Sequence, residues 1–123
     1  MMLGITVVSH VPEIAAGVVQ LLKQVAGETP ITFAGGTDDG RIGTSMEKIT
    51  AAFADNPADT ILAFYDLGSA KMNLEMASEL TDKEIHIYNV PLIEGAYVAA
   101  SLIPTGVTRL QVEEQLAPLM VKG

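Results

Sequence analysis

The sequence predicts a three-layer α/β fold. A doubly wound, mainly parallel sheet forms the middle layer, and helices cover both of its faces. Strand-like apolar segments alternate four times with amphipathic segments, which is typical of strand–helix–strand units. The first apolar segment, LGITVVS at 3–9, lacks the alternation of a half-exposed strand, as expected when both faces of a sheet are covered. Right-handed crossovers then favour the strand order 2-1-3-4.

The first helix follows this strand almost at once. Pro12 fits the first turn of a helix, and Gly27 ends it. The apolar positions that would share one helix face are Ile14, Val18, Leu21, Leu22 and Val25. A second strand, predicted at 31–34, leads into a polar glycine-rich loop, GGTDDGRIG, at 35–43.

The middle of the chain repeats this alternation. Thr44 and Glu47 match a capping box, which predicts the start of the second helix. The third strand is predicted at 60–66, and the next helix begins near Gly68. Methionines at helical spacing on this helix are interpreted as core residues. Its apolar positions are Met72, Met76 and Leu80.

The last third of the chain supplies a fourth strand at 84–90 and two helical segments at 92–102 and 108–120. Pro118 is expected to kink or fray the last helix. No internal repeat or linker interrupts the pattern, and 123 residues is the size of one domain. We therefore expect a single domain over 1–123.

Composition excludes several classes of protein. The absence of cysteine excludes a disulfide framework and a thiolate metal site. A net charge of -8 with only seven Lys and Arg argues against nucleic-acid binding, and suits a partner with a basic face. No apolar run reaches the ~18 residues of a membrane-spanning helix, and the first residues lack the basic start of a signal peptide. We expect a cytoplasmic protein.

Two polar residues follow neighbouring strands of the predicted sheet. His10 comes directly after the strand at 3–9, and Asp66 ends the third strand. In the order 2-1-3-4 a crevice lies beyond the carboxyl ends of these two strands. A carboxylate on one imidazole nitrogen fixes the tautomer and leaves a lone pair on the other. The sequence therefore predicts that Asp66 supports His10 as a nucleophile or base.

Small-residue turns surround this predicted crevice, at 35–36, 43–45 and 68–69. Backbone N–H groups and helix N-termini bind oxyanions, and hydroxyl groups at the caps add donors. Arg41 and Lys71 are the basic side chains nearby in sequence. A phosphoryl group would therefore be held mainly by dipoles, and no metal or cofactor is expected.

Several alternatives use the same residues. A histidine at a strand end can be structural, and His86 is interpreted as structural or as an exposed edge residue. Asp38 and Asp39 are interpreted as the solvated tip of the glycine-rich loop. The residue order of a Walker loop and of a dinucleotide fingerprint is absent. A receiver-like domain with Asp66 as phosphoacceptor is disfavoured, because the acidic residues that hold Mg²⁺ after the first strand in such domains are absent here.

Four motifs give the chain a resemblance to a known family. They are VVSHVPEIAAG at 7–17, GGTDDGRIGTS at 35–45, FYDLGSAKMN at 64–73 and NVPLIEGAY at 89–97. In this order they resemble the enzyme IIA domains of the mannose-type bacterial phosphotransferase system. The similarity is greatest to the phosphotransferase subunits of phosphoenolpyruvate-dependent dihydroxyacetone kinases, and it runs over nearly the whole chain.

The resemblance implies that His10 carries a phosphoryl group on Nε2 and that Asp66 orients Nδ1. It also implies a phosphate site, whose matching positions here are Gly36, Thr44, Ser45 and Ser69. Phosphate would arrive from the histidine-containing phosphocarrier protein and pass to ADP held on the nucleotide-binding subunit of dihydroxyacetone kinase. The resemblance implies homodimers as well. Two rival functions stay open: an enzyme IIA domain of a mannose-type sugar transport system, and a non-catalytic α/β module that binds a small anion.

Overall fold

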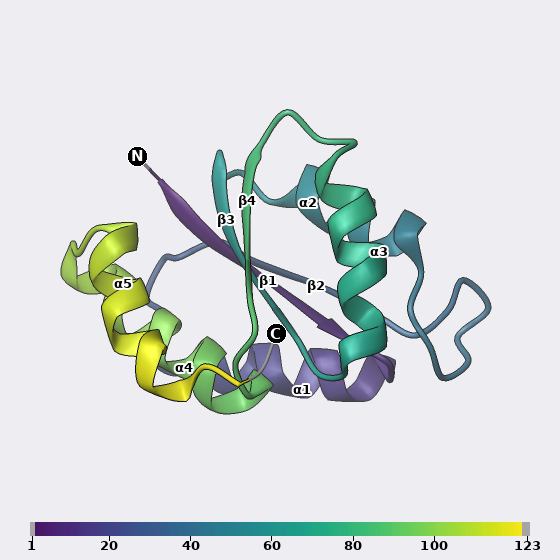
Figure 1. Cartoon of the computed structure of the whole chain (residues 1–123), viewed down its shortest axis with the longest axis horizontal. Helices are drawn as coiled ribbons and strands as arrows, with labels where there is room; N and C mark the ends of the chain where they lie inside the picture. Colours follow the sequence, from purple (N-terminus) through teal and green to yellow (C-terminus); the bar gives the residue numbers. More distant parts are fainter. Residues whose placement is uncertain (1, 122–123) are drawn as a thin grey trace.

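The computed structural model describes residues 2–121; positions 1 and 122–123 of the predicted range 1–123 lie outside the described residues. Four parallel strands form a sheet in the order β2-β1-β3-β4, which confirms the predicted order (Figure 1). The strands are β1 (Leu3–Ser9), β2 (Ile31–Gly35), β3 (Thr60–Tyr65) and β4 (Glu84–Tyr88). The helices are α1 (Pro12–Leu22), α2 (Met46–Asp55), α3 (Gly68–Ser78), α4 (Leu92–Leu102) and α5 (Arg109–Leu116), with short 3-10 turns η1 (Ile103–Thr105) and η2 (Ala117–Leu119). Between residues 2 and 121, no helix is both long and apolar enough to cross a lipid bilayer.

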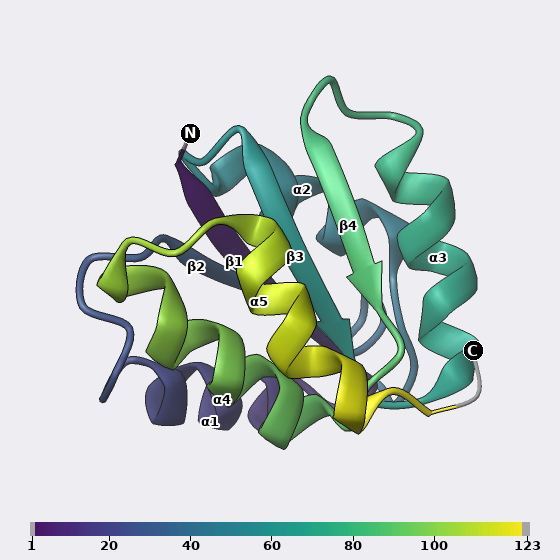
Figure 2. The same cartoon turned by 60° about the vertical axis from the view of Figure 1, so that its left-hand side comes forward.

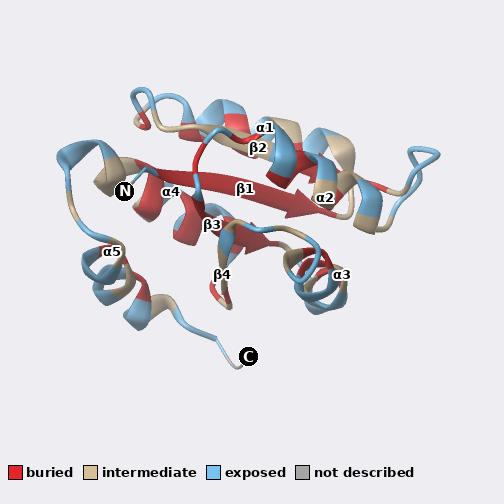
Figure 3. Ribbon diagram, turned by 90° about the horizontal axis from the view of Figure 1, so that it is seen from above, coloured by how far each residue is buried: buried red, intermediate tan, exposed pale blue. Residues whose placement is uncertain are grey.

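Helices cover both faces of the sheet, as predicted. Figure 2 shows α4 and α5 in front of the strands and α2 behind them. The core on the side of α1, α4 and α5 includes Ile5, Val7, Leu62 and Phe64. The core on the side of α2 and α3 includes Val8, Ile61, Ala63 and Tyr65. The two central strands are therefore buried on both faces, which explains why their sequences do not alternate (Figure 3).

The register of the sheet brings the ends of β1 and β3 level with each other. Val8 pairs with Tyr65 of β3 and with Ala34 of β2. One residue later, the Asp66 N–H donates to the Val8 carbonyl at 3.2 Å. Neighbouring strands lie about 5 Å apart, so side chains that leave these two ends are within hydrogen-bonding reach.

The turn between β1 and α1 packs directly against the end of β2. A Cβ atom on Gly35 would lie 2.6 Å from Pro12 Cα, which no real structure tolerates without a shift. The next residue, Gly36, has a φ of +75°, in the left-handed region that favours glycine. The backbone of β2 thus meets the first turn of α1 at a distance that only glycine permits.

The buried face of α1 is rotated from the predicted one. The residues that pack on the sheet are Ala15, Val18, Val19 and Leu22. Ile14 and Leu21, which were predicted on the apolar face of this helix, are exposed. The small side chain of Ala15 faces the strands, and periodicity alone gave too much weight to the larger apolar residues.

The core interpretation of the α3 methionines is wrong. Met72 and Met76 are exposed, and so is Leu80, which follows the helix. The face that packs on the sheet is formed by Ala70, Leu74 and Ala77. Alanine permits a close approach of the helix to the strands but carries a weak hydrophobic signal. The more apolar methionine stripe therefore pointed to the wrong face of the helix.

Several predicted boundaries also shift. Ser45, and not Thr44, caps α2, because its hydroxyl accepts a hydrogen bond from Lys48 N–H at 3.1 Å. The strands β3 and β4 end one and two residues earlier than predicted, at Tyr65 and Tyr88. The last α-helix gives way to the 3-10 turn η2, which contains Pro118, as the fraying prediction requires.

Candidate active site

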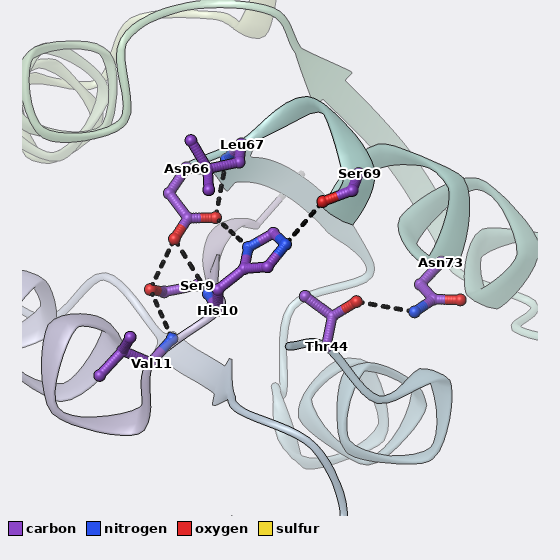
Figure 4. Close-up of polar contacts among 8 residues, drawn as sticks. All are labelled: Ser9, His10, Val11, Thr44, Asp66, Leu67, Ser69 and Asn73. Atoms are coloured by element: carbon purple, nitrogen blue, oxygen red, sulfur yellow. Dashed lines mark hydrogen bonds and ion pairs between the residues drawn. The ribbon is translucent and has the colours of Figure 1, made fainter. Parts of the chain in front are cut away.

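The structure brings the two sequence-predicted residues together at the carboxyl ends of β1 and β3. His10 Nδ1 lies 2.9 Å from Asp66 Oδ1, although 56 positions separate them in the chain (Figure 4). The side chains are 15% and 17% exposed, respectively. The pair is thus largely shielded from water but remains open to the surface on one side.

Four donors hold the Asp66 carboxylate. Oδ1 accepts from His10 Nδ1 and from Leu67 N–H, the latter at 2.7 Å. Oδ2 accepts from His10 N–H at 2.9 Å and from the Ser9 hydroxyl at 2.8 Å. Burial acts to raise the pKa of Asp66, but these hydrogen bonds together outweigh it and lower the pKa below its ordinary value. Asp66 is therefore an anion at neutral pH.

This anion determines the tautomer of His10. An ionised carboxylate only accepts hydrogen bonds, so Nδ1 must carry the proton and donate it to Oδ1. Neutral imidazole then has its lone pair on Nε2. Nε2 points away from Asp66, toward Ser69 (Figure 4). The arrangement presents one nucleophilic nitrogen and keeps a counter-charge behind it.

Ser69 stands directly in front of this nitrogen. Its Oγ lies 2.6 Å from Nε2, so the hydroxyl donates to the lone pair. Ser69 is the second residue of α3, and the first N–H groups of a helix have no acceptor within the helix. A group bound to Nε2 would displace this hydrogen bond and meet the hydroxyl together with the N-terminal end of α3, both suited to an oxyanion.

The glycine-rich loop binds the backbone of the histidine turn. Gly36 N–H donates to the Ser9 carbonyl at 3.1 Å, and Gly43 N–H donates to the His10 carbonyl at 2.9 Å. Gly36, predicted in the phosphate site, therefore already uses its N–H in the protein. Its role in this conformation is to hold the turn that carries His10.

The other predicted phosphate residues occupy two different places. Thr44 Oγ1 accepts from Asn73 Nδ2 at 2.7 Å, a contact that ties the loop to α3 below Ser69 in Figure 4. Ser45 is buried, caps α2 and donates to Asp38. Asp38 is thus bound within the loop, although it is exposed as predicted for a loop tip. Of the four predicted residues, Ser69 is the one that forms a hydrogen bond with the His10 side chain in the described structure.

Three participants were missed from the sequence: the Ser9 hydroxyl, the Leu67 N–H and Asn73. Ser9 could have been found, because a polar side chain in a strand that is buried on both faces needs a hydrogen-bond partner. The backbone N–H of Leu67 leaves no trace in the side-chain pattern. Asn73 was seen in a motif, but its partner Thr44 depends on the path of the loop.

No part of the chain within residues 2–121 gathers three His, Cys, Asp or Glu side chains into a metal site. The second histidine lies elsewhere. His86 is on the edge strand β4, where its Nε2 contacts Glu84 Oε2 at 2.5 Å. This placement agrees with its interpretation as a structural or edge residue.

A shallow apolar groove of about 500 Å³ borders the site. Asp66 and Glu94 are its charged lining residues. The other lining residues include Ile14, Leu67, Pro91, Leu92 and Ile93. Ile14, Leu67 and Ile93 are large apolar side chains exposed beside Asp66.

Comparison with known proteins gives consistent results. The family model described as PTS system fructose IIA component matches residues 4–108. The chain is 49% identical to the PTS-dependent dihydroxyacetone kinase phosphotransferase subunit DhaM of Lactococcus lactis over 97% of both chains. It is 48% identical to the phosphoryl donor subunit DhaM of PEP-dependent dihydroxyacetone kinase 1 of Listeria innocua over 81% of both. The crystal structure of EF1359, a protein of unknown function, aligns with a TM-score of 0.85 at 28% identity, covering 100% of this chain and 98% of that one.

Proposed function

The chain belongs to the family of PTS fructose IIA components, and on that premise we propose that it is the phosphoryl donor subunit of a dihydroxyacetone kinase, with His10 as its phosphoryl carrier. One observation supports this role above the others. Asp66 Oδ1 engages Nδ1 at 2.9 Å, which leaves the lone pair on Nε2, where an incoming phosphoryl group would displace the hydrogen bond from Ser69.

The loading step uses this lone pair directly. Nε2 attacks the phosphorus of a phosphohistidine on the histidine-containing phosphocarrier protein, and the donor's N–P bond breaks as the new one forms. The Nδ1 proton stays on the ring, which becomes a cation paired with Asp66. In-line positioning and dispersed charge stabilisation are what such a transfer chiefly needs.

The unloading step reverses the electron flow. A terminal phosphate oxygen of ADP, held on the nucleotide-binding kinase subunit, attacks phosphorus, and Nε2 leaves with the bonding pair. Loss of the ring's positive charge restores the neutral imidazole, which keeps its Nδ1–H hydrogen bond to Asp66. No residue of this chain needs to gain or lose a proton in either direction.

The surface around the site fits transient protein partners. Exposed apolar side chains at Ile14, Leu67 and Ile93 lie beside Asp66, and the net charge of the chain is -8. A partner that presents a basic rim around an apolar face would be attracted, and salt would slow that encounter. The proposal includes a cytoplasmic homodimer, as the resemblance implies, with this site free for each partner in turn.

Radiolabelled phosphoenolpyruvate, enzyme I and the histidine-containing phosphocarrier protein test the loading step. We expect acid-labile label on the wild-type chain and none on His10→Ala. Label that persists on His10→Ala would remove His10 as the acceptor. Failure to label the wild-type chain would favour the small-anion-binding module instead.

The destination of the phosphoryl group needs a second experiment, because the matching family model is described as a fructose component. Labelled protein is mixed either with the ADP-loaded kinase subunit or with a mannose-type permease domain. We expect rapid discharge to ADP and slow discharge to the permease domain. The reverse order would assign the chain to sugar transport.

A further inference from the structure

We propose that Ser9 is a positioning residue, which acts through Asp66 to keep the lone pair of His10 on Nε2. The inference rests on the proposed function only for its kinetic consequence. The structural part concerns the hydrogen-bond network behind the histidine, which is shown in Figure 4.

Ser9 is the last residue of β1 and is fully buried. A serine hydroxyl has one proton and two lone pairs. The proton goes to Asp66 Oδ2 at 2.8 Å, and the oxygen accepts from Val11 N–H at 3.1 Å. Since the Val11 N–H points into the oxygen, it directs the remaining hydroxyl proton toward the carboxylate.

Among residues 2–121, Ser9 is the one side chain, apart from the reacting imidazole, that donates to Asp66. The other two donors, His10 N–H and Leu67 N–H, belong to the backbone. Oδ2 is therefore held by one backbone group and one hydroxyl, and these two contacts fix the rotation of the carboxylate. That rotation decides whether Oδ1 stays in line with the proton on Nδ1.

Without the hydroxyl, Oδ2 keeps a single donor and Val11 N–H loses its acceptor. A less constrained carboxylate turns away from Nδ1 for part of the time, and the ring then populates the tautomer with its proton on Nε2. That tautomer has no lone pair where the phosphoryl group must bind. Ser9 thus influences reactivity without touching the substrate.

Ring nitrogen chemical shifts measured by NMR report the tautomer directly. The chain has two histidines, so His86 on the distant edge strand is an internal reference in every spectrum. We expect mainly Nδ1–H for His10 in the wild type and a clear increase in Nε2–H in Ser9→Ala. The initial rate of His10 labelling should fall roughly tenfold to a hundredfold, as for the loss of one hydrogen bond to a charged group.

Two variants separate positioning from simple stability. Ser9→Thr keeps the hydroxyl and should restore both the tautomer and the rate. Thr6→Val is a matched control, because Thr6 is also fully buried in β1 and its hydroxyl pairs with Thr32 Oγ1 at 3.0 Å, away from the site. It should lower the melting temperature and leave the His10 spectrum unchanged.

A folded Ser9→Ala protein with a wild-type tautomer would overturn the inference, as would a loss of rate no larger than that of Thr6→Val. If Ser9→Ala does not fold, Ser9→Cys retains the shape with a weak donor and is judged by the same spectrum. The tautomer is measured without any phosphoryl donor. Failure of wild-type labelling would therefore refute the proposed function while the Ser9 inference is still decided by the spectra.

Discussion

Each of the two histidines of this chain contacts a carboxylate, yet the two pairs differ in almost every other respect. His10 and Asp66 follow the ends of two different strands, β1 and β3, and their side chains are 15% and 17% exposed. His86 and Glu84 lie two residues apart on β4, and their side chains are 26% and 50% exposed. Asp66 bonds Nδ1 and leaves Nε2 to the Ser69 hydroxyl, whereas Glu84 bonds Nε2 itself. A histidine–carboxylate contact alone therefore does not identify a catalytic histidine. One must also know which ring nitrogen the carboxylate engages and which groups hold the carboxylate in place.

His86 and Glu84, here called the edge pair, lie beside further charged side chains of α5. Arg109 of α5 lies 3.8 Å from Glu84 and 2.7 Å from Glu113, and Glu113 accepts from the Tyr88 hydroxyl. Burial and the neighbouring Glu113 raise the pKa of Tyr88. These contacts join α5 to β4, so the charges at this end of the molecule connect elements. Around His10, in contrast, the Asp66 carboxylate engages Nδ1, and Nε2 is left to a single neutral hydroxyl, that of Ser69.

The largest expected difference is in phosphorylation itself. His10→Ala removes the nucleophile, so labelling from the phosphocarrier protein should fall by at least roughly a thousandfold. His86→Ala is the matched control and should label at a rate within about twofold of wild type. Equal losses in the two variants would show that the difference between the pairs has no functional meaning.

Asp66→Asn tests the carboxylate with the imidazole in place. An amide carries no charge to stabilise the ring cation and can present N–H to Nδ1, which favours the wrong tautomer. We expect the labelling rate to fall roughly a hundredfold to ten-thousandfold, by analogy with other histidine–aspartate pairs. Glu84→Gln should leave it unchanged. A rate for Asp66→Asn within a few-fold of wild type would mean that Nδ1 needs no anion.

Acid should weaken the fold partly through Asp66. Its pKa in the protein lies below the ordinary value of 3.8, so its stabilising contribution is complete above that pH and disappears as the pH falls through the lower value. Urea denaturation should give a constant stability difference between wild type and Asp66→Asn from about pH 7 to 5. The difference should shrink below about pH 4. A difference that grows on acidification would contradict the assigned ionisation.

The smallest effect concerns the energy of the edge pair. A double-mutant cycle with His86→Ala and Glu84→Gln should give a coupling of less than about 1 kcal/mol, because partly exposed ion pairs are weak. The coupling should diminish further in high salt. A larger, salt-independent value would place this pair in the same class as His10 and Asp66.

The fold and the position of the His10–Asp66 pair could be predicted from the sequence. Strand order and parallel register follow from the alternation of elements, and together they bring His10 beside Asp66. The identity of the engaged nitrogen was expected from the resemblance to a family. The remaining donors were not predicted, because Leu67 contributes a backbone group and Ser9 depends on the exact turn after β1.

The errors have physical causes as well. The sheet-facing side of α3 is formed largely by alanines, which are only weakly hydrophobic. The exposed methionines are more apolar, so the sequence pattern predicted the wrong face as buried. Thr44 and Ser45 both suit a helix cap, and the choice between them depends on loop contacts such as that of Thr44 with Asn73. Local sequence patterns predict which helices and strands form. Close packing decides which face of a helix is buried and which residue caps it.

The contact between Gly35 and Pro12 limits how this site can be transplanted. Because a methyl group on Gly35 would come within 2.6 Å of Pro12 Cα, the end of β2 acts as a rigid stop for the first turn of α1. A designer who grafts the serine–histidine segment onto another parallel sheet must import that neighbouring glycine as well. Without it, the recipient scaffold would push the imidazole out of alignment before any chemistry began.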